Sequence, residues 1–114
     1  MPTGPVTTVV PHDKCVLLAV QKSSLDEMAA EKLMDEVQTE AANAGGKPVV
    51  LDLSRVRFAP SVALGTLVKL TRSFQLDGRR LVLVGVDPRV RGAMQVTRLE
   101  DLLEIRDSID QVKF

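Results

Sequence analysis

Two short runs of almost uninterrupted apolar residues constrain the fold of this chain more than any other feature. They are PVVLDLS at residues 48–54 and LVLVGV at residues 81–86. A strand with one face in solvent alternates apolar and polar residues, whereas a strand covered on both faces is apolar throughout. The two runs therefore predict strands in the middle of a sheet that has protein on both faces.

A helical pattern precedes each of these runs. Within residues 23–46, Ser24 and Glu27 have the spacing of a capping box, and Gly45 and Gly46 are suited to end the helix. The apolar face of this helix is predicted to consist of Leu25, Met28, Ala29, Leu33 and Val37. Over residues 61–76, a second apolar stripe has spacings of four, three and four and consists of Ala63, Leu67, Leu70 and Phe74.

The remaining segments complete an alternation of strands and helices. VTTVV (6–10) and KCVLLAVQ (14–21), joined by a turn, predict an N-terminal β-hairpin. Asp87 is a good helix cap and Pro88 suits the first helical position, so a third helix should start there. LLEIRDS (102–108) predicts a last short strand. The expected fold is a small α/β domain with a mixed, mostly parallel sheet.

Length and composition narrow the class of protein. A chain of 114 residues with 45% hydrophobic residues suits one domain, here residues 1–114, with residues 1–5 expected to be a loose terminus. Cys15 is the only cysteine, so no intrachain disulfide can form. No basic-then-apolar leader and no apolar run of about 20 residues is present, so we expect a cytoplasmic protein without direct membrane insertion.

The sequence offers little support for catalysis or for nucleic-acid binding. His12 is the only histidine, and a Gly-x-Ser-x-Gly elbow, a phosphate-binding glycine loop and a zinc-ligand set are all missing. Arginines concentrate in residues 47–106, but no aromatic residues that stack on bases lie between them. We therefore expect a non-enzymatic protein with no catalytic residues, no metal, no cofactor and no nucleic-acid partner.

The junction RFAPSVALG, residues 57–65, carries a resemblance to a known family. Asp52, Leu53 and Ser54 end the first apolar strand, and the residues that match the family after them are Val56, Phe58, Ser61, Leu64, Gly65, Gly78, Leu81, Leu83, Pro88 and Val90. In this order and spacing the chain resembles a STAS domain. The family comprises bacterial anti-sigma factor antagonists and the matching domain of sulfate transporters, and the resemblance is firmest over residues 49–106.

The resemblance implies a regulatory domain that docks on an anti-sigma factor with serine kinase activity. In the family, such a kinase phosphorylates a hydroxyl that follows the Asp of an Asp-Ser-Ser/Thr-Gly motif. Here Pro60 stands at the Asp position, Ser61 at the first hydroxyl position, Val62 at the second and Ala63 at the Gly position. Ser61 is therefore the candidate phosphoacceptor. The candidate partner-binding residues are Arg57, Phe58, Pro60, Ser61, Val62, Ala63 and Gly65.

Several alternatives remain open from the sequence. Ser61 is equally suited to be a structural helix cap, since serine is favoured there. Because Pro60 and Val62 depart from the motif, the chain can instead be a constitutive scaffold or adaptor of a stressosome-like or transporter-associated complex. A third hypothesis is a small ligand in a crevice at the carboxyl ends of the strands. The sequence leaves the oligomeric state and the identity of the partner undetermined.

Overall fold

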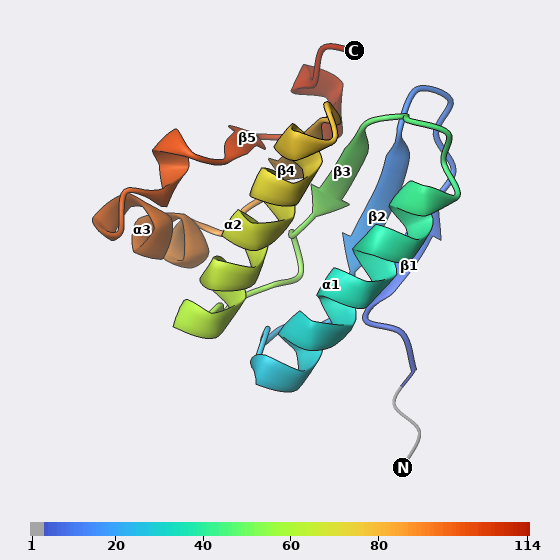
Figure 1. Ribbon diagram of the computed structural model, residues 1–114. Coiled ribbons are helices and arrows are strands. Elements are labelled where there is room, and N and C mark those ends of the chain that lie inside the picture. The colour runs from blue at the N-terminus through green and yellow to red at the C-terminus, as the bar shows by residue number, and fades with distance from the viewer. Residues whose placement is uncertain (1–3) are drawn as a thin grey trace.

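Strands and helices alternate along most of the chain in the computed structural model, which describes residues 4–114 (Figure 1). The elements are β1 (Thr7–Val10), β2 (Val16–Val20), α1 (Glu27–Ala42), β3 (Val49–Asp52), α2 (Ser61–Leu76), β4 (Leu81–Val84), α3 (Pro88–Val96), the 3₁₀ turn η1 (Leu99–Asp101), β5 (Glu104–Arg106) and the 3₁₀ turn η2 (Ile109–Gln111). Of the terminus expected to be loose, residues 1–3 lie outside the described residues, and Gly4 and Pro5 precede β1.

The five strands form one sheet in the order β1-β2-β3-β4-β5. β1 and β2 pair antiparallel, and every other pair is parallel. In the register of the three central strands, Leu51 lies opposite both Leu18 and Leu83. The predicted α/β fold, with a mixed sheet that starts with a hairpin, is therefore confirmed.

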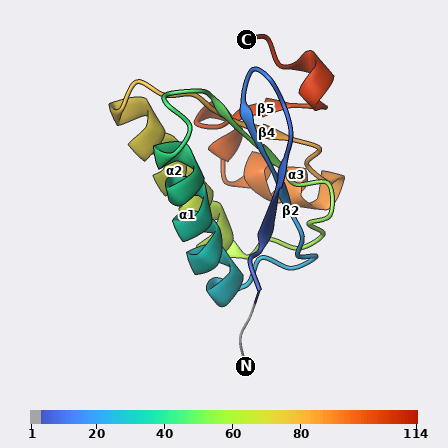
Figure 2. The ribbon, with the colours of Figure 1, turned by 90° about the vertical axis from the view of Figure 1, so that its right-hand side faces the viewer.

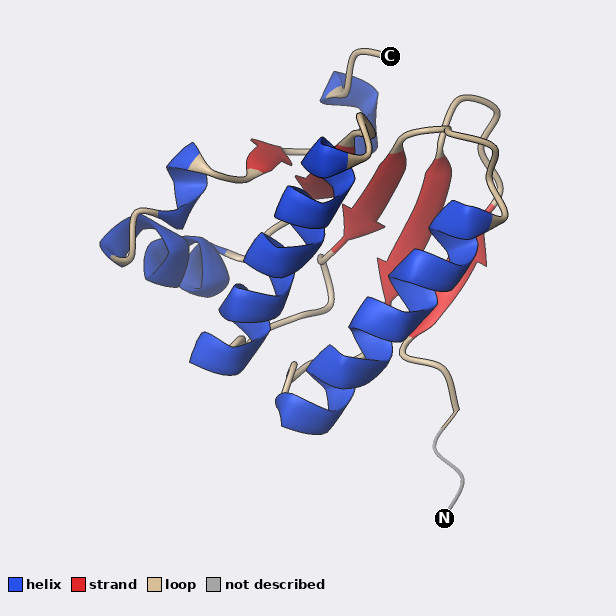
Figure 3. Cartoon of the chain, viewed as in Figure 1, coloured by secondary structure: helices blue, strands red, loops and turns tan. Residues whose placement is uncertain are grey.

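The two central strands are covered on both faces, as their uninterrupted apolar sequence predicts. α1 and α2 lie together on one side of the strands, and the C-terminal turn lies on the other (Figures 2 and 3). Leu51 and Leu83 pack in a large cluster with Leu33 and Leu67 of the two helices. The intervening residues, such as Val50 and Val82, pack in a second cluster whose members include Cys15, Leu17 and Val112.

The start of α1 differs from the prediction. Asp26 is the cap, and its Oδ1 accepts a hydrogen bond of 2.8 Å from the Ala29 N–H, so the expected Ser24–Glu27 capping box is wrong. The reason is tertiary, because Ser24 forms an isolated parallel bridge with Phe58 and stays extended. Met28, predicted to be in the core, is 63% exposed.

The start of α3 follows the prediction, and its end holds an unusual backbone conformation. Asp87 caps the helix by accepting a 2.9 Å bond from the Arg89 N–H, and Pro88 is the first helical residue. After the helix, Arg98 has a φ of 60° and is left-handed, a conformation that costs a residue with a Cβ about 1–2 kcal/mol. Glycine is the usual residue at this position after a helix.

Replacing a fully buried helix residue should destabilise the domain strongly. Leu67→Ala removes a side chain that is 0% exposed and leaves a cavity between α2 and the sheet. We expect the free energy of unfolding to fall by about 2–5 kcal/mol in urea denaturation. In the matched control, Leu76→Ala on the same helix, the side chain is 88% exposed and the change should stay within about 0.5 kcal/mol. An equal loss of unfolding free energy in the two variants would contradict the assignment of Leu67 to the buried face of α2 and of Leu76 to the exposed face.

Relieving the left-handed arginine should stabilise the domain. Arg98→Gly removes the Cβ that makes a φ of 60° unfavourable, at the cost of a more flexible unfolded chain. The net gain in the free energy of unfolding should be about 0.5–1 kcal/mol, measured as a shift in the denaturation midpoint. Arg98→Ala keeps the Cβ and should give no comparable gain. If Arg98→Gly were less stable than wild type, the claim that the left-handed backbone at Arg98 is strained would be wrong.

Candidate functional site

The loop between β3 and α2 is fixed by local hydrogen bonds and by one buried anchor. The Oδ1 of Asp52 accepts a 2.9 Å bond from the Ser54 N–H, and the Val56 N–H donates to the Leu53 carbonyl at 3.0 Å. The Val56 side chain is fully buried in the main core. Gly85 allows the close approach, since a Cβ there would lie 3.0 Å from Asp52 Oδ1.

The same loop is tied to the segment that connects β2 and α1. The N–H groups of Arg57 and Phe58 both donate to the Ser23 carbonyl, at 2.7 and 3.1 Å, and the Leu25 N–H donates to the Phe58 carbonyl at 3.0 Å. These bonds use the main chain of Phe58 and leave its ring 60% exposed. The loop therefore presents a large apolar side chain on a rigid backbone.

An ion pair joins the loop to the start of α3. Arg57 Nη1 lies 3.0 Å from Asp87 Oδ2 and also donates to the Ser54 carbonyl at 3.0 Å. The pKa of Asp87 is lowered, first by the hydrogen bond from the Arg89 N–H and further by the side chains of Arg89 and Arg57. Sequence reasoning missed this contact because 30 residues separate its partners and neither belongs to a recognisable pair motif.

Ser61 is the first residue of α2 and is exposed. The cap position belongs to Pro60, and no side chain caps the helix, so the structural role expected for Ser61 is wrong. The Pro60 carbonyl accepts bonds from the Ala63 and Leu64 N–H groups at 2.9 and 3.2 Å. The N–H groups of Ser61 and Val62 lie at the open end of the helix, where the helix itself provides no acceptor.

The predicted partner-binding residues separate into exposed and buried ones. The exposed members are Arg57, Phe58, Ser61, Val62 and Gly65, with Pro60 partly exposed. Ala63 is 1% exposed and packs in the core, so it is not part of an accessible surface. A Cβ on Gly65 would meet nothing within 4 Å, so a close approach to a neighbouring strand does not explain this glycine.

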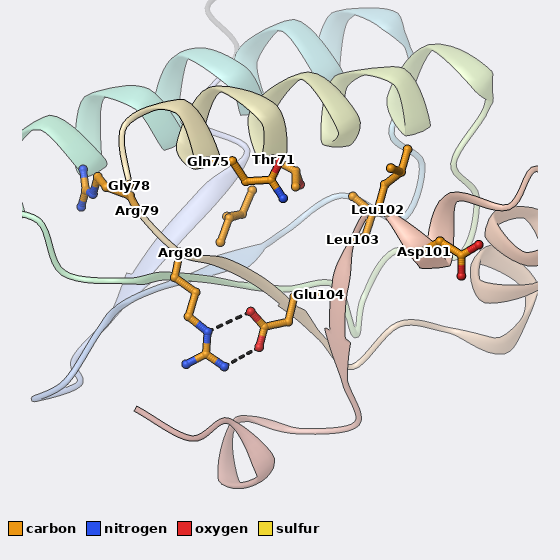
Figure 4. A pocket seen from close by; sticks show the side chains of 10 residues that line it. Thr71, Gln75, Gly78, Arg79, Arg80, Asp101, Leu102, Leu103 and Glu104 are labelled. Carbon is orange, nitrogen blue, oxygen red and sulfur yellow. Dashed lines mark hydrogen bonds and ion pairs between the residues drawn. The ribbon is translucent and has the colours of Figure 1, made fainter.

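A cleft at the opposite end of the sheet has a volume of about 400 Å³ (Figure 4). It lies between the end of α2 and the η1–β5 segment, and Thr71, Gln75, Leu102 and Leu103 are among its lining residues. The sequence predicted a crevice at the carboxyl ends of the strands, whereas this cleft lies beside Leu81, where β4 begins.

The rim of the cleft carries a bidentate ion pair (Figure 4). Arg80 Nε donates to Glu104 Oε1 at 2.8 Å, its Nη2 donates to Oε2, and its Nη1 donates to the Lys113 carbonyl. The hydrogen bonds from Arg80 are the main cause that lowers the pKa of Glu104 below its usual 4.5. The pair therefore holds β4, β5 and the C-terminal segment together.

Metal-binding clusters and membrane-spanning helices are absent from residues 4–114. No group of three or more His, Cys, Asp or Glu side chains lies together in a way that could hold a metal ion. In the same part of the chain, no helix is long and apolar enough to cross a membrane. Cys15 is buried, and burial raises the pKa of its thiol.

Comparison with known proteins identifies the family of this chain. The family model of the STAS domain matches residues 7–112, so the chain belongs to the STAS domain family. Among its relatives is an anti-sigma-B factor antagonist of Staphylococcus aureus, 23% identical over 77 residues that cover 68% of this chain and 71% of the relative. A homologue of the protein TM1081 in Thermotoga neapolitana is 27% identical over 96 residues, which cover 84% of this chain and 85% of the relative.

The fold also matches solved structures of this family. The NMR structure of TM1081, a protein of Thermotoga maritima, superposes with a TM-score of 0.80 and 25% sequence identity. The match covers 97% of this chain and 86% of TM1081. The resemblance inferred from the residues around Ser61 is therefore confirmed at the level of family and fold.

Acidification should remove the contribution of the Arg80–Glu104 pair. A carboxylate with a lowered pKa in the folded state stabilises the fold above its unfolded pKa, and this stabilisation is lost as the pH falls through the lower, folded value. Glu104→Gln should therefore unfold more easily than wild type at pH 7, by up to about 1 kcal/mol. The difference should shrink steadily below pH 4.5 in thermal denaturation. A difference that is independent of pH would show that the charge of Glu104 does not stabilise the fold.

Proposed function

We propose that this chain is a regulatory protein-binding domain that acts as an anti-sigma factor antagonist. It docks on an anti-sigma factor with serine kinase activity, through the surface formed by the β3–α2 loop and the start of α2. Membership of the STAS family and the name of the S. aureus relative support this class of function. The rigid presentation of Phe58, with Val62 beside Ser61 in the first turn of α2, supports the location.

The observation that carries the proposal is the position of Ser61. Ser61 is exposed and is the first helical residue, and its hydroxyl takes no part in capping α2. A kinase can reach such a hydroxyl without unfolding the helix. A phosphate placed there would carry about 1.5 to 2 negative charges next to the partial positive charge of a helix N-terminus. The fold should therefore tolerate the modification.

The same phosphate would alter the docking surface. Phe58 is 60% and Val62 is 44% exposed, and an apolar partner surface that packs on them would have to desolvate the new charge. Arg57 holds the loop through its bond to Asp87, a contact in which the Ser61 side chain takes no part. Phosphorylation thus changes the chemistry of the interface while the backbone that presents it stays in place.

The departures from the family motif favour a second candidate function. Pro60 and Val62 replace a carboxylate and a second hydroxyl, so the chain can be a constitutive scaffold or adaptor of a stressosome-like or transporter-associated complex. In that case a charge at Ser61 should have little effect on binding. The two functions predict opposite results for one substitution.

A charge at Ser61 should weaken binding to the anti-sigma kinase. We expect wild type and Ser61→Ala to bind equally, and Ser61→Asp to bind at least about tenfold more weakly, measured by calorimetry with the purified kinase. Incubation with the kinase and ATP should add one phosphate to wild type at Ser61 and none to Ser61→Ala, as read by mass spectrometry. Ser61→Asp should unfold at the same or a slightly higher temperature, because the charge is favourable at a helix N-terminus.

The control variant is Gln38→Glu, which adds a negative charge at an exposed position of α1. It should bind the kinase as wild type does. Full binding by Ser61→Asp, without phosphate on the wild-type protein, would support the constitutive scaffold and reject the switch. Lack of binding by wild type would reject the anti-sigma factor antagonist function itself.

A further inference from the structure

Strand β1 forms one edge of the sheet and leaves main-chain groups unpaired with any strand. The Gln21 N–H donates to the Val6 carbonyl at 2.8 Å, and Thr7 lies opposite Val20. In an antiparallel pair, residues alternate between those that bond the partner strand and those that face away. Here the main-chain groups of Thr7 and Val9 face away from β2. An exposed row of this kind is a template for an added strand.

A groove runs between this edge and helix α1. We define the β1–α1 groove as the hollow of about 390 Å³ lined by Pro5, Thr7, Val9, Asp35, Glu36, Thr39 and Glu40. A second hollow of about 320 Å³ shares Val9 and Glu40 with it and extends past Val10 to the β1–β2 turn. The two hollows follow the length of β1, which suits an extended segment better than a compact ligand.

The helix wall of the groove is acidic. Asp35, Glu36 and Glu40 all line it. Glu36 is already engaged, because its two carboxylate oxygens accept bonds of 2.8 Å from the Val6 and Thr7 N–H groups. Asp35 is exposed and Glu40 is partly exposed, so both remain accessible to a cationic side chain. Lys47 lines the far end of the second hollow, where its Nζ donates to the Asp13 carbonyl.

Glu36 also determines which part of the edge is available. It occupies the outward N–H of Thr7 and so closes the beginning of β1. The N–H of Val9 and the carbonyls of Thr7 and Val9 face outward beyond that point, and Val9 is 52% exposed. Two carbonyls and one N–H therefore remain to bond an added strand, whose main chain supplies affinity and whose side chains supply specificity.

Charge decides between the possible occupants. A second copy of this chain, added edge to edge through β1, would bring two acidic helix walls towards each other, and like charges in proximity are unfavourable. A segment rich in lysine or arginine would instead place its cations against Asp35 and Glu40. We propose that the β1–α1 groove binds an extended basic peptide segment of a partner protein, which adds to the sheet beside β1.

This surface is separate from the one around Ser61. The Ser61 surface lies at the carboxyl ends of the parallel strands, where α2 begins, whereas the groove runs along the outer side of β1 (Figure 1). The domain can therefore hold a basic segment in the groove while its Ser61 surface contacts an anti-sigma factor. Failure of either proposal leaves the other untouched.

The test uses isotope-labelled protein and a synthetic peptide with alternating lysine and valine, six residues long and blocked at both ends. In NMR titration, the peptide should shift the amide signals of Val9 and of residues around Asp35 and Glu40. The double variant Asp35→Lys/Glu40→Lys should bind about tenfold more weakly. Removing one surface charge pair costs about twofold to fivefold, and this variant removes two. The matched control Asp101→Lys/Asp110→Lys changes two exposed carboxylates elsewhere by the same net charge and should bind as wild type does.

Two further peptides separate strand addition from general charge attraction. The same peptide with glutamate in place of lysine should not bind. A lysine–valine peptide methylated on alternate backbone nitrogens keeps its charge but loses donors for the sheet, and it should bind several-fold more weakly. The proposal would be overturned if the first peptide did not bind, or if both double variants lost affinity equally. Concentration-dependent dimerisation through β1, measured by sedimentation velocity, would also overturn it.

Discussion

Burial of β3 and β4 on both faces is the constraint on which the rest of the structure depends. Leu51 and Leu83 point into the large core with the helices, and Val50 and Val82 point into the smaller one on the other face. Strands enclosed in this way are typical of parallel sheets whose neighbours are joined by helices, and β3 and β4 do pair parallel. Both α1 and α2 then begin at the carboxyl ends of the strands, and the β3–α2 loop is brought to the same end.

That loop becomes a rigid platform because its polar main chain is satisfied by other loops. Ser23 accepts two of its N–H groups, and Arg57 links it to Asp87 at the start of α3. Phe58 and Ser61 are consequently displayed on backbone that is fixed before any partner arrives. A pre-organised surface loses less conformational freedom on binding, which favours affinity. Rigidity and exposure together make this end of the domain suited to a regulated protein contact.

The sequence predicted those features that depend on local or periodic patterns. The stripe of Leu67, Leu70 and Phe74 fixes the buried face of α2, and Asp87 with Pro88 fixes the start of α3. The same stripe includes Ala63, so its burial was already contained in the pattern that predicted the helix. The prediction that Ala63 belongs to the contact surface is therefore inconsistent with its place on the buried face of the helix.

Features that depend on tertiary contacts were not predictable from one sequence. Ser24 has good capping chemistry, but its bridge to Phe58 holds it extended, and Asp26 caps α1 instead. Pro60 takes the cap position of α2 with an extended backbone, which moves Ser61 into the helix and frees its hydroxyl. The pairing of Arg57 with Asp87 and the acidic groove beside β1 both require knowledge of which segments become neighbours.

Hydrogen–deuterium exchange of the complex with the proposed partner, an anti-sigma kinase, tests the central claim most directly. The amides of Ser61 and Val62 have no acceptor within α2, so in the free domain they should exchange rapidly. If the first turn of α2 is the docking surface, these amides and that of Phe58 should become slower to exchange when the kinase binds. Unchanged exchange at Ser61 and Val62, with protection confined to β5 and η1 at the other end of the sheet, would contradict the account.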